Sequence, residues 1–151
     1  MAAQAMKWYN KALQKIGNGN INLLSDTFRA ILVTSASNFA TATLGLLGSL
    51  TNEIADGNGY STSGKALSGV AWTVGASAKQ YKFDADDINW SANGGSISNI
   101  KGIVVVKIGA SAGARHLVGY ASLTSSQFAL ASGNRININW NSGGILTLAR
   151  T

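Results

Sequence analysis

The chain has no cysteine, no proline and few charged residues. Without cysteine it can form neither disulfides nor thiolate metal sites. Without proline, where a usage of roughly 5% would give about seven residues, its loops must turn on glycine, asparagine, aspartate or serine. The 18 glycines fit that requirement. Only 12% of the residues are charged and 46% are hydrophobic, a balance that favours a subunit in permanent contact with other protein.

Targeting segments are missing as well. The N-terminal stretch MAAQAMKWYNKALQKIG lacks the apolar core of a secretory signal, and no stretch approaches the roughly 18 apolar residues of a membrane span. We therefore expect a soluble protein that is not exported by the general route and has no membrane partner. The net charge of +6 comes from lysines and arginines scattered singly, which favours a mildly basic surface over a nucleic-acid partner.

Candidate catalytic residues are scarce. His116 is the only histidine. A nucleophilic Ser or Cys needs an adjacent base, and a zinc site needs three or four ligands. One histidine in a chain without cysteine therefore favours neither a catalytic nor a zinc-binding role. The cluster DADD at 84–87 lacks the spacing of a helix-loop-helix calcium site, so a solvated strand edge or turn is the preferred interpretation. Glu53 and Asp56 could act as a glycosidase pair only across a cleft that nothing in the sequence supports. We predict no enzyme activity, no cofactor and no metal site.

A chain of 151 residues predicts a single domain spanning residues 1–151. Residues 5–16 place apolar side chains at helical spacing, with most of the lysines and glutamines on the other face. This pattern predicts a short amphipathic helix, an N-terminal helical arm of the domain. Gly17 is well placed to end the helix, and Lys15 suits its last turn.

Strand patterns dominate the rest of the chain. A largely buried strand is expected at 26–35, whereas 38–52 is ambiguous and could hold a short helix around 43–50. Six further strands alternate with clusters of Gly, Ser and Asn, at 66–75, 80–90, 102–108, 115–122, 134–141 and 144–150. This spacing predicts a mainly β fold, an antiparallel β-sandwich of jelly-roll-like form behind the short N-terminal helix.

Some of these patterns also predict the surroundings of a strand. The alternation over 136–140 predicts two isoleucines and a tryptophan on a core face and asparagines on the other. IVVVKI at 103–108 should be covered on both faces. The segments INWSANGGSI at 88–97 and INWNSGGIL at 138–146 echo each other, and each glycine pair is expected to form a hairpin turn. The echo could be a duplicated β unit or two hairpins built by the same local rules.

The glycine-rich stretch EIADGNGYSTSG at 53–64 could cradle a ligand or form a structural turn. It is not a phosphate loop, since no G-K-[ST] follows at the required spacing, and it does not complete a G-x-G-x-x-G fingerprint. An asparagine between two glycines suits left-handed backbone. We therefore predict a tight structural turn with an anchoring tyrosine, formed by Gly57, Asn58, Gly59, Tyr60 and Gly64.

Trp8 and Tyr9, flanked by Lys7 and Lys11, stand outside the predicted strands. The other three tryptophans have apolar neighbours in predicted strands, which is typical of core residues. The N-terminal group could contact nucleic acid, but an aromatic helix face that docks on protein is the preferred interpretation. We therefore take Lys7, Trp8, Tyr9 and Lys11 as the candidate partner contact.

The order of motifs resembles that of a group of small structural proteins of tailed bacteriophages. The matching segments are YNKAL, SDTFRAILVTSA, EIADGNGYSTSGKAL, FDADDINWSANGGSIS followed by IVVVK, LVGYASL and GGILTLA. They cover the chain from about residue 8 to 149. The most specific pieces are the EIADGNGY turn and the W-x-A-x-GGSI segment, whereas the small-residue loop at 109–116 departs from the family pattern.

The resemblance implies a virion component made in the cytoplasm of the host bacterium, with a β-sandwich fold and no catalytic residues to carry over. The preferred position is the capsid exterior, as a cement or decoration protein that binds the major capsid protein and assembles as a homotrimer or similar ring. The alternatives are a tail or head-tail joint protein, or a carbohydrate- or receptor-binding module of a phage appendage. Such a module would use Tyr120, Asn137, Asn139 and Asn141.

Overall fold

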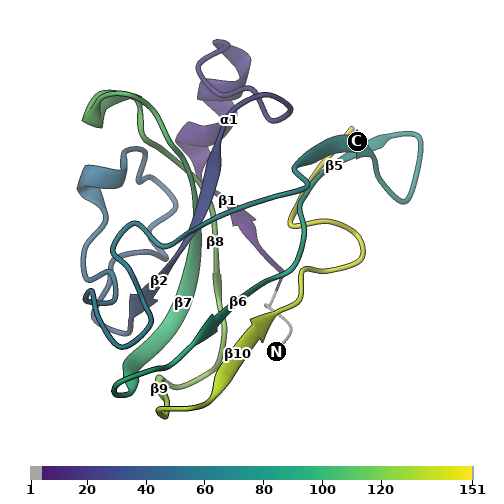
Figure 1. The fold of residues 1–151 in the computed structure, drawn as a ribbon. Helices are drawn as coiled ribbons and strands as arrows, with labels where there is room; N and C mark the ends of the chain where they lie inside the picture. Colours follow the sequence, from purple (N-terminus) through teal and green to yellow (C-terminus); the bar gives the residue numbers. More distant parts are fainter. Residues whose placement is uncertain (1–4, 151) are drawn as a thin grey trace.

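The computed structural model describes residues 5–150. It is mainly β, with antiparallel sheets and one short helix near the N-terminus, α1 (Asn10–Gly17), as the sequence predicted (Figure 1). The strands are β1 (Lys7–Trp8), β2 (Phe28–Thr34), β3 (Lys65–Ala66), β4 (Ala71–Val74), β5 (Gln80–Asp84), β6 (Ile88–Ser91), β7 (Ile97–Lys107), β8 (His116–Ser122), β9 (Phe128–Leu130), β10 (Arg135–Ile138) and β11 (Leu146–Ala149).

The largest sheet has the strand order β1-β8-β7-β2-β3, and β9 pairs with the first part of β7. Its central strand β7 is fully buried from Ile103 to Val106, which confirms that both faces of this segment are covered. On one face the ring of Tyr120 meets those of Tyr9 and Phe39, with centroids 4.7 and 6.3 Å apart. Helix α1 and the loop after β2 therefore cover that face.

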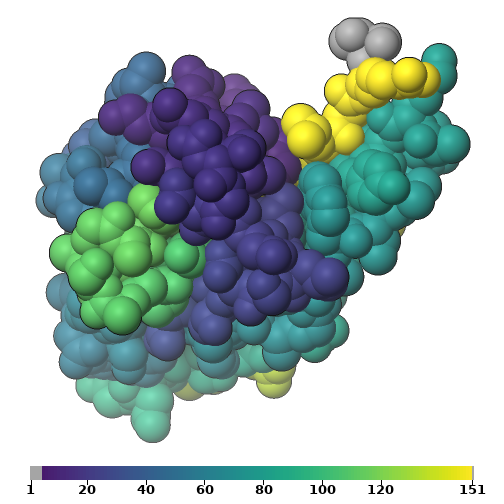
Figure 2. Space-filling model, turned by 90° about the horizontal axis from the view of Figure 1, so that it is seen from above, coloured from purple at the N-terminus to yellow at the C-terminus, as the bar shows by residue number. Residues whose placement is uncertain are grey.

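A long, bent ribbon supplies the second layer. Its two strands are β5 continuing into β6 and β10 continuing into β11, because β6 pairs with β10 and β5 with β11. In the β6–β10 half, Ile136, Ile138 and Trp140 are buried, as the alternation predicted. The other half gains β4 beside β5. We call β4, β5 and β11 the projecting sheet, because they extend away from the body of the molecule (Figures 1 and 2).

The N-terminal helix begins later than its sequence pattern predicted, at Asn10 instead of residue 5. Lys7 and Trp8 instead pair with Tyr120 and Gly119 as strand β1. The apolar spacing before residue 10 therefore serves a sheet edge, where backbone pairing to β8 replaces helical hydrogen bonds. In the ambiguous segment 38–52, the only helical turn described is the 3-10 turn η1 (Leu47–Ser49).

The predicted hairpins at the two glycine pairs are wrong. Gly94 and Gly144 do adopt positive φ, 77° and 100°, but β6 does not pair with β7, nor β10 with β11. The two echoing segments pair with each other instead, so that Ile88 lies opposite Ile138. The predicted strand 80–90 also breaks in two, because the ribbon bends between β5 and β6.

Candidate interaction surface

The aromatic residues of the N-terminal group are largely used inside the fold. Tyr9 is fully buried, and its hydroxyl donates a hydrogen bond to the carbonyl oxygen of Phe39 at 2.6 Å. Burial, with a smaller contribution from Tyr120, raises the pKa of Tyr9 well above its ordinary value. Tyr9 therefore offers no surface to a partner, and the expected aromatic helix face is wrong on this point.

The rest of this group is more accessible, but it is not one surface. Trp8 is half-buried on the edge strand β1, and its indole N–H donates to the carbonyl oxygen of Thr147 at 2.7 Å. Lys7 is exposed in the same strand, whereas Lys11 lies in α1 and packs over Gly45. Trp8 thus ties the N-terminal strand to the root of the projecting sheet.

The glycine-rich stretch contains a two-residue turn centred on Asn58 and Gly59, which adopt φ of 53° and 92°. The N–H of Gly57 donates to the carbonyl oxygen of Tyr60 at 2.8 Å, and the N–H of Tyr60 donates back at 2.9 Å. A side chain at Gly59 would overlap the carbonyl oxygen of Ser91. Positive φ at both central residues is the requirement that Asn-Gly meets in such turns.

Tyr60 anchors this turn to the large sheet. Its hydroxyl donates to Glu53 Oε1 at 2.8 Å and accepts from the N–H of Leu32 in β2 at 3.1 Å. Burial, and then the neighbouring carboxylate of Glu53, raises the pKa of Tyr60 well above its ordinary value. Close by, Gly64 has a φ of 64° and lies against the backbone of Ala30. These residues hold the loop 53–64 against β2.

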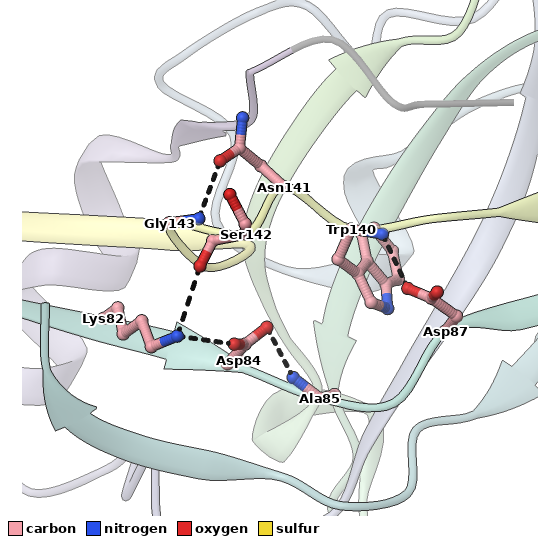
Figure 3. A network of polar contacts seen from close by, with 8 residues as sticks. All are labelled: Lys82, Asp84, Ala85, Asp87, Trp140, Asn141, Ser142 and Gly143. Carbon is pink, nitrogen blue, oxygen red and sulfur yellow. Dashed lines mark hydrogen bonds and ion pairs between the residues drawn. The ribbon is translucent and has the colours of Figure 1, made fainter. Parts of the chain in front are cut away.

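The acidic cluster at 84–87 shapes the bend of the ribbon (Figure 3). Asp84 Oδ2 pairs with Lys82 Nζ at 3.0 Å, and its Oδ1 accepts from the N–H of Ala85 at 3.1 Å. Across the bend, Asp87 Oδ1 accepts from the N–H of Trp140 at 2.8 Å. The Trp140 indole N–H donates to the carbonyl oxygen of Asp86 at 2.9 Å. The carboxylates thus serve a turn, and within residues 5–150 no group of three or more His, Cys, Asp or Glu could hold a metal ion.

His116 begins strand β8 and is almost fully buried, with 5% of its surface exposed. It lines a hollow of about 310 Å³ together with Lys11 and Lys15. Its Nδ1 has no hydrogen-bond partner within residues 5–150. Burial, and then the positive charges of Lys15 and Lys107, lowers the pKa of His116 below its ordinary value of 6.5.

The lowered pKa of His116 predicts a loss of stability in mild acid. As the pH falls through about 6.5, the unfolded chain binds a proton that the folded chain resists, so the free energy of unfolding decreases. We expect the melting temperature of the wild type to drop between about pH 7.5 and 5.5, a range in which unperturbed carboxylates stay ionised. His116→Gln should flatten this dependence in a thermal-unfolding series. An unchanged slope in that variant would assign the effect to other groups.

The projecting sheet has one continuous apolar face. Cross-strand pairing places Trp72 and Leu146 on either side of Phe83, and Val74 and Leu148 on either side of Tyr81. Residues directly opposite each other share a face of a sheet, so all six side chains point the same way. Phe83 and Leu146 are buried at the root of the sheet, where the ring of Phe83 meets that of Phe28 at 4.9 Å.

The outer half of this face has no cover within residues 5–150. Val74, Tyr81 and Leu148 are 53%, 45% and 42% exposed, and the ring of Trp72 stacks on that of Tyr81 at 5.6 Å. A hollow of about 470 Å³ is lined by Trp72, Tyr81 and Leu148 and also reaches Lys79 and Arg150. Figure 2 shows how far this region stands out from the body. We call Trp72, Val74, Tyr81 and Leu148 the outer apolar face.

Sequence reasoning had placed Trp72 in the core and had not identified this surface. The available signal was the alternation W-T-V, Y-K-F and L-T-L in three predicted strands. Alternation shows that one face of a strand is apolar, but it does not show whether the same chain covers that face.

Comparison with known proteins found no matching family model, no matching curated protein and no matching solved structure. No helix within residues 5–150 is long and apolar enough to cross a membrane.

Proposed function

We propose that the chain is a structural subunit of a bacteriophage virion, a cement or decoration protein that binds the major capsid protein on the capsid exterior. The observation that carries this proposal is the outer apolar face on the projecting sheet. Large apolar side chains gathered on a projection are typical of a surface that other protein covers. Such a subunit stabilises a shell through many copies of a modest contact.

The motifs that resemble the phage proteins support the same proposal. EIADGNGY forms the turn that docks on β2, and FDADDINW forms the bend from which the projecting sheet extends. Both motifs therefore determine the shape of the molecule. Proteins that shared them would share the bend and would present a sheet in the same place.

Counting the protein on purified virions of the encoding phage tests this proposal. A cement protein is expected in hundreds of copies, bound to heads that also resist heat better than heads stripped of it. Adding the purified protein back to stripped heads should restore both the copy number and the heat resistance. Six, twelve or a few dozen copies would instead indicate the tail or a vertex, and absence from virions would end the proposal.

A carbohydrate-binding module is the second candidate, and one observation favours it. The stacked pair Trp72 and Tyr81 borders a hollow with Lys79 and Arg150, and exposed aromatic rings are what sugar-binding surfaces need. The surface that the sequence suggested for this role, Tyr120 with three asparagines, offers no exposed aromatic ring, because Tyr120 is buried beneath Tyr9. Binding of the purified protein to a glycan array, abolished by Trp72→Ala, would favour this candidate over the shell.

A further inference from the structure

The outer edge of the projecting sheet is unprotected. Strand β4 pairs with β5 only, and within residues 5–150 no backbone hydrogen bond joins Ala71–Val74 to any other segment. The outer strands β1, β3 and β10 each carry a cation, Lys7, Lys65 or Arg135, and charged edges discourage pairing with another chain. The sequence of β4, Ala-Trp-Thr-Val, has no such feature, and neither do the edge strands β9 and β11. An edge of this kind is a template for a further strand.

The backbone groups available on this edge can be identified. The N–H of Gly75 donates to the carbonyl oxygen of Gln80 at 2.7 Å, so these two residues form a hydrogen-bonded pair of the antiparallel ladder. Such pairs alternate along the strands, which makes Thr73 and Lys82 the next bonded pair. Trp72 and Val74 lie between them. Their N–H and C=O groups therefore point outward from β4.

We propose that a second copy of this chain pairs with β4, antiparallel and across a two-fold axis that passes beside Thr73. In this register Trp72 lies opposite Val74 of the second copy, and the outward groups of both residues form four hydrogen bonds. A one-residue shift of this register would place Thr73 opposite Val74 of the second copy. The two outer apolar faces would then lie on opposite sides of the joined sheet. The two projecting sheets then form one six-stranded sheet, with their outer apolar faces on the same side.

The charges of the projecting sheet favour a second copy as the occupant. Lys79 is exposed in the turn at the outer end of the sheet, and Asp86 is exposed at its root, beside Ser68 and Gly69. Antiparallel pairing brings the outer end of each sheet alongside the root of the other. The two-fold axis thus creates two equivalent approaches of Lys79 to Asp86. Lys82 and Asp84 are already paired within the chain and do not oppose this arrangement.

This pairing refines the proposed function and rests on it. Contact between identical strands is closed by a two-fold axis, so it gives a dimer in place of the trimer that the phage resemblance implied. The joined sheets would bring two outer apolar faces together, and the doubled face would be what the shell contacts. Failure of the pairing would leave the shell proposal untouched, because the two are measured separately.

Single-cysteine variants of the cysteine-free chain test the register directly. Thr73 in β4 and Thr147 in β11 are both exposed, and each is the cross-strand neighbour of Lys82 in β5. The two threonines therefore lie on the same face of the projecting sheet, one on each of its edge strands. In the proposed dimer Thr73 faces its own copy in a non-bonded pair, where Cα atoms are about 4.5 Å apart and a disulfide can form. We expect Thr73→Cys to give a product of twice the chain mass on mild oxidation, and Thr147→Cys to give none at the same protein concentration.

Mass in solution provides the second measurement. The wild type should sediment as a dimer, and Val74→Lys should reduce it to a monomer with an unchanged circular dichroism spectrum. Leu148→Lys places the same charge on the same face but on the opposite edge strand, so it should remain dimeric. A monomeric or trimeric wild type would overturn the proposal, as would crosslinking of both cysteine variants at equal rates. Loss of the dimer in both lysine variants would replace edge pairing with packing between apolar faces.

Discussion

Replacing Gly64 with alanine is expected to cost on the order of 4 kcal/mol of stability or to prevent folding, the range seen when backbone strain and a core clash combine. The residue adopts a φ of 64°. A Cβ there would overlap the carbonyl oxygen of Ala30 and would lie 2.8 Å from the Cα of Ile31. Both neighbours are backbone atoms of fully buried residues of β2, a strand that is held between β7 and β3 and has little room to shift.

Gly94→Ala is the matched control for this variant. Gly94 has a similar φ of 77°, but no atom lies within 4 Å of the position that a Cβ would take. Its substitution should cost only the strain of left-handed backbone, roughly 1 kcal/mol. Urea unfolding followed by circular dichroism measures both variants. Equal losses of stability would mean that strain alone, and not contact with β2, makes glycine necessary at position 64.

Local signals were sufficient to predict the turn and much of the sheet. Asn-Gly is the pair that best tolerates positive φ at both central residues of a tight turn, so the turn at Asn58 and Gly59 could be predicted without knowledge of distant residues. The alternation over 136–140 likewise identified the buried face of its strand, since the side-chain period of a strand is a local property. The apolar run at 103–108 predicted a central strand, because a strand that is covered on both faces has apolar residues without alternation.

Long-range pairing could not be predicted in this way. Lys7 and Trp8 form a strand only because the edge of β8 is available to them. Similarly, the echoing segments at 88–97 and 138–146 are separated by some fifty residues of sequence, yet they pair with each other. Each glycine pair looked like a hairpin because local turn chemistry does not specify which strands will meet. Tertiary context decides between these possibilities.

The candidate surface illustrates the same limit. The residues chosen first, Trp8 and Tyr9, stood outside strand patterns in the sequence, and the structure places Tyr9 wholly inside. Trp72 stood inside a strand pattern and proves to be partly exposed beside Tyr81. An aromatic residue in an alternating strand is buried only where another layer covers it. The projecting sheet extends beyond the covering layer, and a local sequence pattern does not show where that layer ends.

The hydroxyl of Tyr60 is expected to matter more for stability than that of Tyr9, although both rings are buried. Tyr60→Phe leaves the buried N–H of Leu32 without its acceptor and removes a donor from Glu53. Tyr9→Phe removes one donor from the carbonyl oxygen of Phe39. An unpaired buried N–H is tolerated less well than an under-satisfied carbonyl, and leaving a buried donor unsatisfied costs about 1–3 kcal/mol.

We therefore expect Tyr60→Phe to lose about 2 kcal/mol or more, and Tyr9→Phe about 1 kcal/mol, in the same urea-unfolding measurement. Amide hydrogen exchange adds a local readout. The N–H of Leu32 should exchange faster in Tyr60→Phe by more than the change in global stability explains, because its acceptor has been removed. The N–H of Leu32 in Tyr9→Phe should change only with global stability. If Leu32 kept its protection in Tyr60→Phe, the bond to the phenol oxygen would not be what holds the loop 53–64 on β2.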